Sequence, residues 1–159
     1  MRITIAAVGR MKAGPERELL DRYLDRAGKQ GRPLGITRVE VREIPESRAA
    51  RAEDRKAEEA VALLAGLPDD ARLIALDEHG RALPSRAFAD DVAACLAGGQ
   101  DLTILIGGAD GHGAAVLERA DLLLAFGAMT WPHQIVRMLA AEQIYRATTI
   151  LAGHPYHRE

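Results

Sequence analysis

The chain has 159 residues, 48% of them hydrophobic, and a net charge of -2, which is the composition of a globular domain with one core. The slight acidic surplus counts against a general nucleic-acid-binding surface, so any RNA site has to be a local patch. The single cysteine, Cys95, excludes an intrachain disulfide. No apolar run reaches the roughly 20 residues of a membrane span, and residues 1–8 are too short for a signal peptide. We therefore expect a cytoplasmic protein in which Cys95 fills the core.

Hydrophobic periodicity in the first half of the chain predicts a strand, a helix, a strand and a second helix. The strands cover residues 2–8 and 36–44, and Pro45 ends the second one. The first helix covers residues 15–28. The second is long and highly charged, over residues 47–67, with Ser47 as its N-cap. Both signs of charge alternate along it, so we interpret the charges as a solvated face rather than a binding patch.

The second half of the chain contains continuous apolar strands over residues 72–76, 102–106 and 122–126. These strands are separated and followed by a turn over residues 77–80 and by helices over residues 85–96, 114–120 and 133–149. Buried strands that alternate with helices predict one α/β domain over residues 1–159, with a mostly parallel sheet and helices on both faces.

Ligands of open α/β sheets bind at the carboxyl ends of the strands. Leu76, Gly107 and Phe126 stand at three of these ends, so we expect the three segments to converge on one pocket. Gly107, Gly108 and Gly111 form either a nucleotide-binding loop or a plain tight turn. They lack the spacing of a dinucleotide fingerprint and the lysine of a P-loop.

The loop over residues 126–131 ends in Met129, Thr130 and Trp131, directly before Pro132 and the last helix. An apolar loop at a strand end suits an adenine ring or a thioether better than a phosphate. The alternative is a packed connection without a ligand. Pro132 is suited to a helix start, where its missing N–H is not needed.

The last helix carries two pairs with i, i+4 spacing, His133 with Arg137 and Glu142 with Arg146. One interpretation is two surface ion pairs, which contribute little to stability. Because apolar residues follow Arg137, the other interpretation is a half-buried arginine with an anionic partner.

The C-terminal tail concentrates His154, Tyr156, His157 and Arg158 within five positions. A metal site would need further ligands that the sequence does not offer, so we predict none. We expect the tail to fold over a site, where it offers a ring for base stacking and titratable imidazoles.

Four ordered motifs span the chain from its middle to its end: Leu-Ile-Gly-Gly-x-x-Gly (105–111), Met-Thr-x-Pro-His-Gln-x-x-Arg (129–137), Glu-Gln-x-Tyr-Arg (142–146) and Pro-Tyr-His-Arg-Glu (155–159). Together with the start of the chain and its length, they resemble the ribosomal RNA large subunit methyltransferase H family of the SPOUT class. Members of that family use S-adenosyl-L-methionine to methylate N3 of a pseudouridine in 23S rRNA.

The resemblance implies a C-terminal trefoil knot and a homodimer in which one subunit's tail completes the partner's site. It places the cofactor against a set of eight residues: Leu76, Gly107, Phe126, Gly127, Ala128, Met129, Thr130 and Trp131. Trp131 stands where smaller apolar residues are common in the family, so the shape of the pocket is expected to differ.

Methylation of an imide nitrogen requires that its proton leave, so a base or a cation that stabilises the anion is needed. We expect His154 or His157 to take the proton, Tyr156 to stack on the base, and Arg137 and Arg146 to neutralise an oxygen or hold a phosphate. The low net charge favours assembled ribosomes over free RNA as the substrate. Two rival functions are a methyltransferase acting on tRNA and a non-catalytic protein that binds ribosomes.

Overall fold

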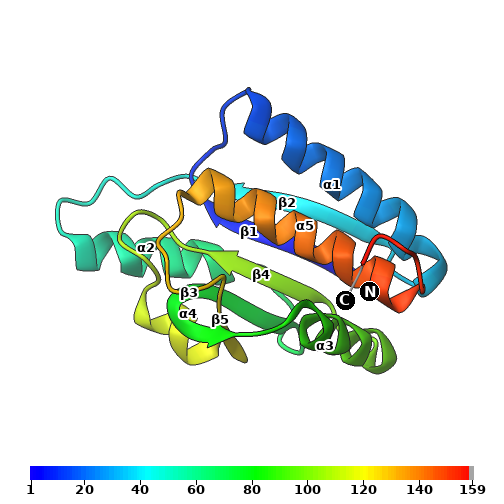
Figure 1. Ribbon diagram of the computed structural model, residues 1–159. Coiled ribbons are helices and arrows are strands. Elements are labelled where there is room, and N and C mark those ends of the chain that lie inside the picture. The colour runs from blue at the N-terminus through cyan, green and yellow to red at the C-terminus, as the bar shows by residue number, and fades with distance from the viewer. Residues whose placement is uncertain (158–159) are drawn as a thin grey trace.

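Strands and helices alternate along the whole chain in the computed structural model, which describes residues 1–157 (Figure 1). The elements are β1 (Arg2–Val8), α1 (Pro15–Gly31), a 3-10 turn (Arg32–Leu34), β2 (Arg38–Ile44), α2 (Ala52–Leu64), β3 (Arg72–Ala82), α3 (Ser85–Gly98), β4 (Leu102–Ile106), α4 (Ala114–Arg119), β5 (Leu122–Ala125) and α5 (His133–Leu151). The strands pair in the order β2-β1-β4-β3-β5, and every pair is parallel. The predicted α/β fold with a parallel sheet is confirmed.

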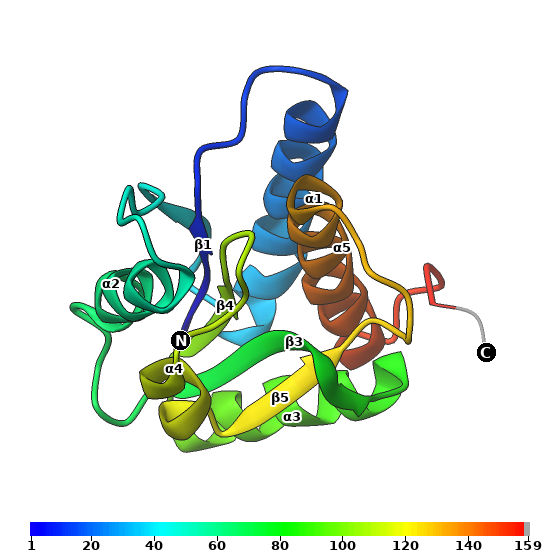
Figure 2. The ribbon, with the colours of Figure 1, turned by 90° about the vertical axis from the view of Figure 1, so that its left-hand side faces the viewer.

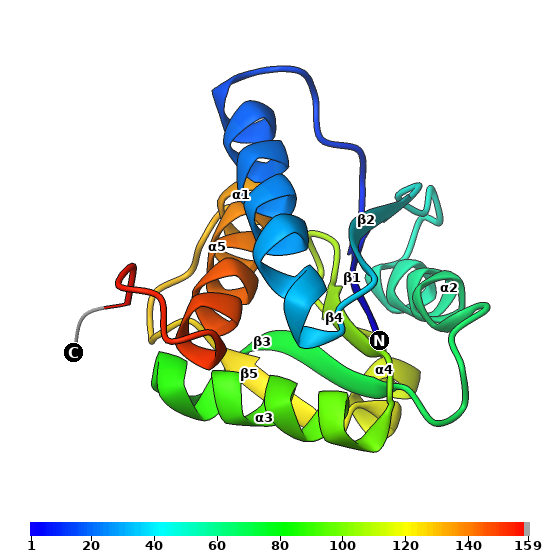
Figure 3. The ribbon, with the colours of Figure 1, turned by 90° about the vertical axis from the view of Figure 1, so that its right-hand side faces the viewer.

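Helices cover both faces of the sheet, as predicted (Figures 2 and 3). Side chains alternate along β1, because successive residues of a strand point to opposite faces. Ile3 and Ile5 pack in one cluster with residues of α1, α3 and α5, whereas Ala6 and Val8 pack in a second cluster with residues of α2 and α4. Cys95 is buried in α3, as expected, and this burial raises the pKa of its thiol. No helix in the described part of the chain is long and apolar enough to cross a membrane.

The predicted start of the second helix at Ser47 is wrong. The helix α2 begins at Ala52, and residues 45–51 form an irregular connection after β2. The Ser47 backbone N–H donates to Glu59 at 3.0 Å, and its hydroxyl accepts from the Ala49 N–H at 3.1 Å. Ser47 therefore binds the connection to Glu59 on the side of α2 and is not the N-cap of that helix.

The predicted turn over residues 77–80 is also wrong, because β3 continues through these residues to Ala82. Its pairing with β5 is interrupted between Leu76 and Arg81, which makes an irregularity in the middle of the strand. Gly80 permits the close approach there, since a Cβ atom would lie 2.6 Å from the carbonyl carbon of Leu123. Residues 77–79 lie in this interrupted stretch, where Glu78 and His79 are exposed.

The carboxyl ends of the parallel strands all face one edge of the molecule, on the left in Figure 1 and toward the viewer in Figure 2. The loops after β1, β2, β4 and β5 leave from this edge. The tail after α5 lies at the other end of that helix (Figure 3).

Candidate cofactor pocket and C-terminal cluster

A cavity of about 410 Å³ opens at the carboxyl ends of β3, β4 and β5. The convergence of these three strand ends on one pocket, expected from the sequence, is confirmed. Seven of the eight residues predicted to hold the cofactor line the cavity: Leu76, Gly107, Phe126, Gly127, Met129, Thr130 and Trp131. Ala128 is exposed and is absent from the lining.

The loop after β4 is a tight turn whose backbone forms part of the cavity wall. The Gly111 N–H donates to the Gly108 carbonyl at 3.0 Å, and Gly111 has a φ of +82°, which favours glycine. A Cβ atom at Gly107 would lie 2.9 Å from the carbonyl carbon of Gly111. Glycine at position 107 is therefore required for the loop to fold back on itself beside the cavity.

Three carboxylates, those of Asp77, Glu78 and Asp110, stand on the polar side of the cavity. Asp110 forms an ion pair with Arg55 of α2 at 2.7 Å, and the hydrogen bond with that guanidinium lowers the pKa of the Asp110 carboxyl. Asp77 accepts a hydrogen bond from the His79 N–H at 2.8 Å. Since Arg55 neutralises Asp110, the negative charge that favours a positively charged ligand comes from Asp77 and Glu78.

The part of the cavity lining formed by residues 126–131 is largely apolar and partly open to solvent. Met129 is 75% exposed and Trp131 is 42% exposed, although both side chains are large and hydrophobic. A second cavity of about 350 Å³ shares Phe126, Gly127 and Trp131 with the first and reaches Ser85 and Gln143 between α3 and α5. The 126–131 loop therefore separates two cavities and is not a fully packed connection.

His112, which the sequence analysis did not single out, also lines the first cavity. It is 7% exposed, and its Nε2 atom lies 3.1 Å from the carbonyl oxygen of Leu76. Burial is the main cause that lowers the pKa of its imidazole, against the opposing effect of nearby carbonyl groups and Asp77. The only signal in the sequence was its position beside Gly111.

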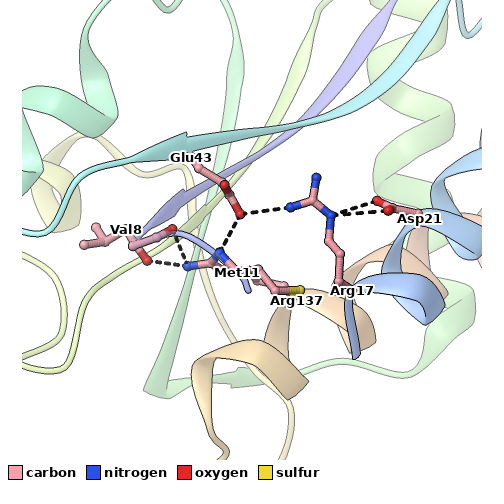
Figure 4. Close-up of polar contacts among 7 residues, drawn as sticks. Val8, Met11, Arg17, Asp21, Glu43 and Arg137 are labelled. Atoms are coloured by element: carbon pink, nitrogen blue, oxygen red, sulfur yellow. Dashed lines mark hydrogen bonds and ion pairs between the residues drawn. The ribbon is translucent and has the colours of Figure 1, made fainter. Parts of the chain in front are cut away.

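Arg137 is buried beneath the loops of the carboxyl edge (Figure 4). Its guanidinium donates to the carbonyl oxygens of Val8 and Gly9 and forms an ion pair with Glu43 at 3.2 Å. Glu43 also accepts from the Met11 N–H at 2.9 Å. The interpretation of His133 and Arg137 as a surface pair is wrong, and the prediction of an arginine with an anionic partner is confirmed.

Burial lowers the pKa of the Arg137 guanidinium, and Glu43 and Glu46 oppose that effect. Since the guanidinium contacts the end of β1 and a residue of β2, it holds the first turns of α5 against the sheet. Val136, its neighbour on α5, lines the first cavity. The structure thus places Arg137 behind the cavity wall.

Arg146 and Glu142 form the ion pair that their spacing predicted, at 2.5 Å, and the tail packs against it. The Tyr156 hydroxyl donates to Glu142 at 3.1 Å, and the Arg146 guanidinium lies 5.0 Å from the centre of the Tyr156 ring. His157 Nδ1 lies 3.5 Å from Arg146, and the ring of Tyr145 lies 4.7 Å from that of Tyr156.

The hydrogen bond with Glu142 raises the pKa of Arg146. Burial is the main cause that raises the pKa of Tyr156, and hydrogen bonds and charge interactions with Tyr23 and Glu142 add to it. The three predicted residues Arg146, Tyr156 and His157 are thus brought together in one cluster. His154 is exposed, and its Nδ1 accepts from the Tyr156 N–H at 3.2 Å. Arg158 and Glu159, the last residues of the tail motif, lie outside the described residues.

The tail cluster and the first cavity lie at different ends of α5. His133 lines the cavity, whereas Tyr145 packs on Tyr156, and their separation of 12 positions corresponds to about 18 Å of helix. Within one chain, the predicted catalytic residues of the tail therefore do not reach the predicted cofactor pocket. Among the described residues, no group of three or more His, Cys, Asp and Glu side chains is arranged to hold a metal ion.

A parallel α/β sheet with a ligand-sized cavity at the carboxyl ends of its strands defines a class of fold that binds nucleotides and related cofactors. The fold is similar to that of a probable methylase family protein from Haemophilus influenzae Rd KW20, with a TM-score of 0.51 and 14% identity, covering 99% of this chain and 70% of that one. A family model described as "Predicted SPOUT methyltransferase" matches residues 1–157. The chain belongs to the SPOUT methyltransferase family.

Curated relatives match the chain over nearly its full length. Proteins named "Ribosomal RNA large subunit methyltransferase H" from Brucella anthropi, Xanthobacter autotrophicus and Sinorhizobium medicae are 59%, 58% and 57% identical to it. Each alignment covers 99% of this chain and 99% of the relative. The resemblance seen in the sequence motifs is confirmed.

Proposed function

We propose that this chain is an S-adenosyl-L-methionine-dependent enzyme that methylates N3 of a pseudouridine in 23S rRNA, on ribosomes in the cytoplasm. One observation carries the proposal: the strand-end cavity is lined by nearly all the residues that the methyltransferase resemblance assigns to the cofactor. The names of the relatives, which specify large-subunit rRNA, supply the substrate class.

The residues of the cavity fit the proposed cofactor. A volume of about 410 Å³ lies in the usual range for a small-molecule site. Leu76, Phe126 and Trp131 offer apolar surface for an adenine ring, while Asp77 and Glu78 offer negative charge for a sulfonium and an ammonium group. Gly107 supports a turn that a Cβ atom would prevent. When bound, the cofactor would supply an electrophilic methyl group.

Residues of the tail would orient the RNA base and remove its proton. The N3 proton of the pseudouridine goes to His154 or His157, the ring of Tyr156 stacks on the base, and Arg146 neutralises the developing charge on a carbonyl oxygen. The ion pair of Arg146 with Glu142 holds the guanidinium in place beside Tyr156. Arg137, whose donors already bind Val8, Gly9 and Glu43, acts instead as a positioning residue for α5.

The working enzyme is a homodimer in which the tail of one subunit reaches the cavity of the other. Two observations support this arrangement: the tail cluster is separated from its own cavity along α5, and Met129 and Trp131 leave apolar surface exposed at the cavity mouth. The trefoil knot that the resemblance implies stays a prediction.

A local basic patch would bind the RNA backbone beside the cavity. Arg10 and Lys12 lie in the loop after β1, and Arg48 lies in the loop after β2, on the same edge of the sheet as the cavity. All three side chains are exposed and form no ion pair with the rest of residues 1–157. Their placement agrees with the local RNA site that the low net charge requires.

The first test is calorimetric titration with S-adenosyl-L-methionine, followed by methyl transfer to ribosomes that lack the modification. We expect binding, and transfer to a pseudouridine in 23S rRNA identified by modification mapping. Binding with transfer to tRNA instead would favour the first rival function. Absence of cofactor binding would favour a non-catalytic ribosome-binding protein.

The shared site is tested by mixing two inactive variants, Gly107→Ala in the cavity and His154→Ala/His157→Ala in the tail. A heterodimer of the two retains one intact pair of cavity and tail, so random mixing should restore about a quarter of wild-type activity. No recovery from verified heterodimers would contradict a site shared between subunits.

A further inference from the structure

Gln143 in α5 forms two hydrogen bonds through the opposite ends of its side-chain amide. The hydroxyl of Ser85, the first residue of α3, donates to Gln143 Oε1 at 2.8 Å. Gln143 Nε2 donates to Glu142 Oε2 at 2.7 Å. All three residues are half-buried. A chain of hydrogen bonds therefore runs from the start of α3 to the carboxylate that the tail contacts through Tyr156.

The neighbours of Gln143 determine which way its amide points. The Glu142 carboxylate, which is paired with Arg146, can only accept hydrogen bonds, so the amide nitrogen faces it. The amide oxygen then faces Ser85, whose hydroxyl supplies a donor. The reversed amide would place its oxygen opposite Glu142 Oε2, with no donor between the two atoms. Ser85 and Glu142 together therefore hold Gln143 in one orientation.

Glu142 divides its two oxygens between Gln143 and the tail cluster. Oε1 accepts from Arg146, at 3.0 Å from Nε and 2.5 Å from Nη2, and from the Tyr156 hydroxyl at 3.1 Å. Oε2 accepts from Gln143. The last side-chain torsion of a glutamate has no narrow energy minimum, so the donors around the carboxylate set its plane. With Oε2 held by Gln143, Oε1 stays directed at Arg146 and Tyr156.

The packing of α3 against α5 has a separate source. Phe88 of α3 and Ile144 of α5 are buried in one apolar cluster, and the burial of apolar side chains is the main force that holds two elements together. The hydrogen bonds of Ser85 and Gln143 therefore contribute the orientation of Glu142 more than the attachment of the two helices.

We propose that Gln143 is a positioning residue for methyl transfer, which orients Glu142 and so holds Arg146 and Tyr156 in the arrangement that receives the RNA base. Ser85 contributes by fixing the amide of Gln143. The proposal rests on the proposed function, in which Arg146 and Tyr156 contact the pseudouridine. It extends that site to the start of α3.

The test compares Gln143→Met with wild type in the single-turnover rate of methyl transfer to ribosomes that lack the modification, at saturating ribosomes and cofactor. Methionine is similar in length and forms neither hydrogen bond. We expect the rate constant to fall about fivefold to tenfold, the usual effect of one hydrogen bond, because Arg146 and Tyr156 lose their fixed arrangement. The Kd for S-adenosyl-L-methionine, measured by calorimetry, should stay within about twofold of wild type.

Three further variants separate positioning from a general loss of structure. Ser85→Thr keeps the hydroxyl and should match wild type in rate, whereas Ser85→Ala removes the donor and should lower the rate about twofold to threefold. The matched control is Gln100→Met. Gln100 follows the other end of α3 and donates to the Asp70 carbonyl at 3.0 Å, outside the lining of both cavities. Its replacement removes one glutamine hydrogen bond and should leave the rate unchanged.

A second measurement needs no turnover. The NMR signal of the Tyr156 ring carbon that bears the hydroxyl reports the hydrogen bond to Glu142, and Tyr156→Phe identifies this signal among the three tyrosines. Gln143→Met should shift the signal, because Glu142 is no longer held through Oε2. Gln100→Met should leave it in place.

The possible outcomes differ in what they overturn. If Gln143→Met transfers methyl groups as fast as Gln100→Met, or leaves the Tyr156 signal unchanged, positioning by Gln143 is wrong while the proposed function stands. If Gln143→Met weakens cofactor binding as strongly as it lowers the rate, Gln143 acts through the wall of the second cavity, which it lines with Phe126 and Trp131, and the proposal is overturned. If wild type neither binds the cofactor nor transfers a methyl group, the proposed function fails and the proposal fails with it.

Discussion

Replacing Arg137 with methionine removes the buried guanidinium drawn in Figure 4 and keeps most of the apolar stem of the side chain. Arg137 is 3% exposed and supplies donors to two carbonyl oxygens, those of Val8 and Gly9, and to the Glu43 carboxylate. Breaking a buried ion pair by removing one partner costs about 3–5 kcal/mol. Glu43 is partly exposed and keeps the Met11 N–H as a donor, which places the expected loss near the lower limit. We expect Arg137→Met to lower the free energy of unfolding by about 3 kcal/mol.

Urea denaturation followed by circular dichroism measures this loss, at a fixed protein concentration because a dimer would make the midpoint depend on concentration. The matched control is Arg17→Met. Arg17 also lies beside Glu43, at 3.6 Å, but it is 41% exposed, so its replacement should cost less than about 1 kcal/mol.

The double variant Arg137→Met/Glu43→Gln shows whether the loss comes from the pair. If Arg137 acts through Glu43, the double variant should be more stable than the sum of the two single losses predicts. A loss below about 1 kcal/mol for Arg137→Met would refute the assignment of Arg137 as the buried contact that holds α5 against the sheet. Strict additivity of the two changes would refute the part of that assignment that depends on Glu43.

Three other expected outcomes concern separate parts of the molecule. Gly80→Ala should lower the midpoint of thermal unfolding, because the new Cβ would lie 2.6 Å from the backbone of Leu123; an unchanged midpoint would exclude this close approach. The lowered pKa of His112 means that only the unfolded chain takes up its proton as the pH falls below about 6.5, so wild type should lose more stability between pH 7 and 5 than His112→Leu. Equal pH slopes would contradict a neutral, buried ring. Tyr156→Phe should lower the free energy of unfolding by about 1 kcal/mol through loss of the hydrogen bond to Glu142, whereas Tyr156→Leu should cost more because the ring contacts are lost too.

The amino-acid sequence was sufficient to predict the architecture and the location of the pocket. Continuous apolar strands such as residues 102–106 are typical of strands buried on both faces, and their alternation with helices predicts a parallel sheet between two layers of helices. In a parallel sheet the carboxyl ends share one edge, so Leu76, Gly107 and Phe126 had to meet there. The ordered motifs predicted the family because each of them combines several residue types at defined spacings, which makes the motifs specific.

The partners of individual side chains were decided only in the tertiary structure. Arg137 pairs with Glu43, which is 94 positions away, and no local pattern reports which distant carboxylate meets a buried guanidinium. His112 was missed because its burial comes from the packing of β3 and β4 around a loop that reads as polar in the sequence. The continuation of β3 past residue 76 depended on the approach of β5 to Gly80, again a contact between distant segments. Periodicity in a sequence reports which face of an element is buried, while the neighbour that buries it is determined by how the elements pack.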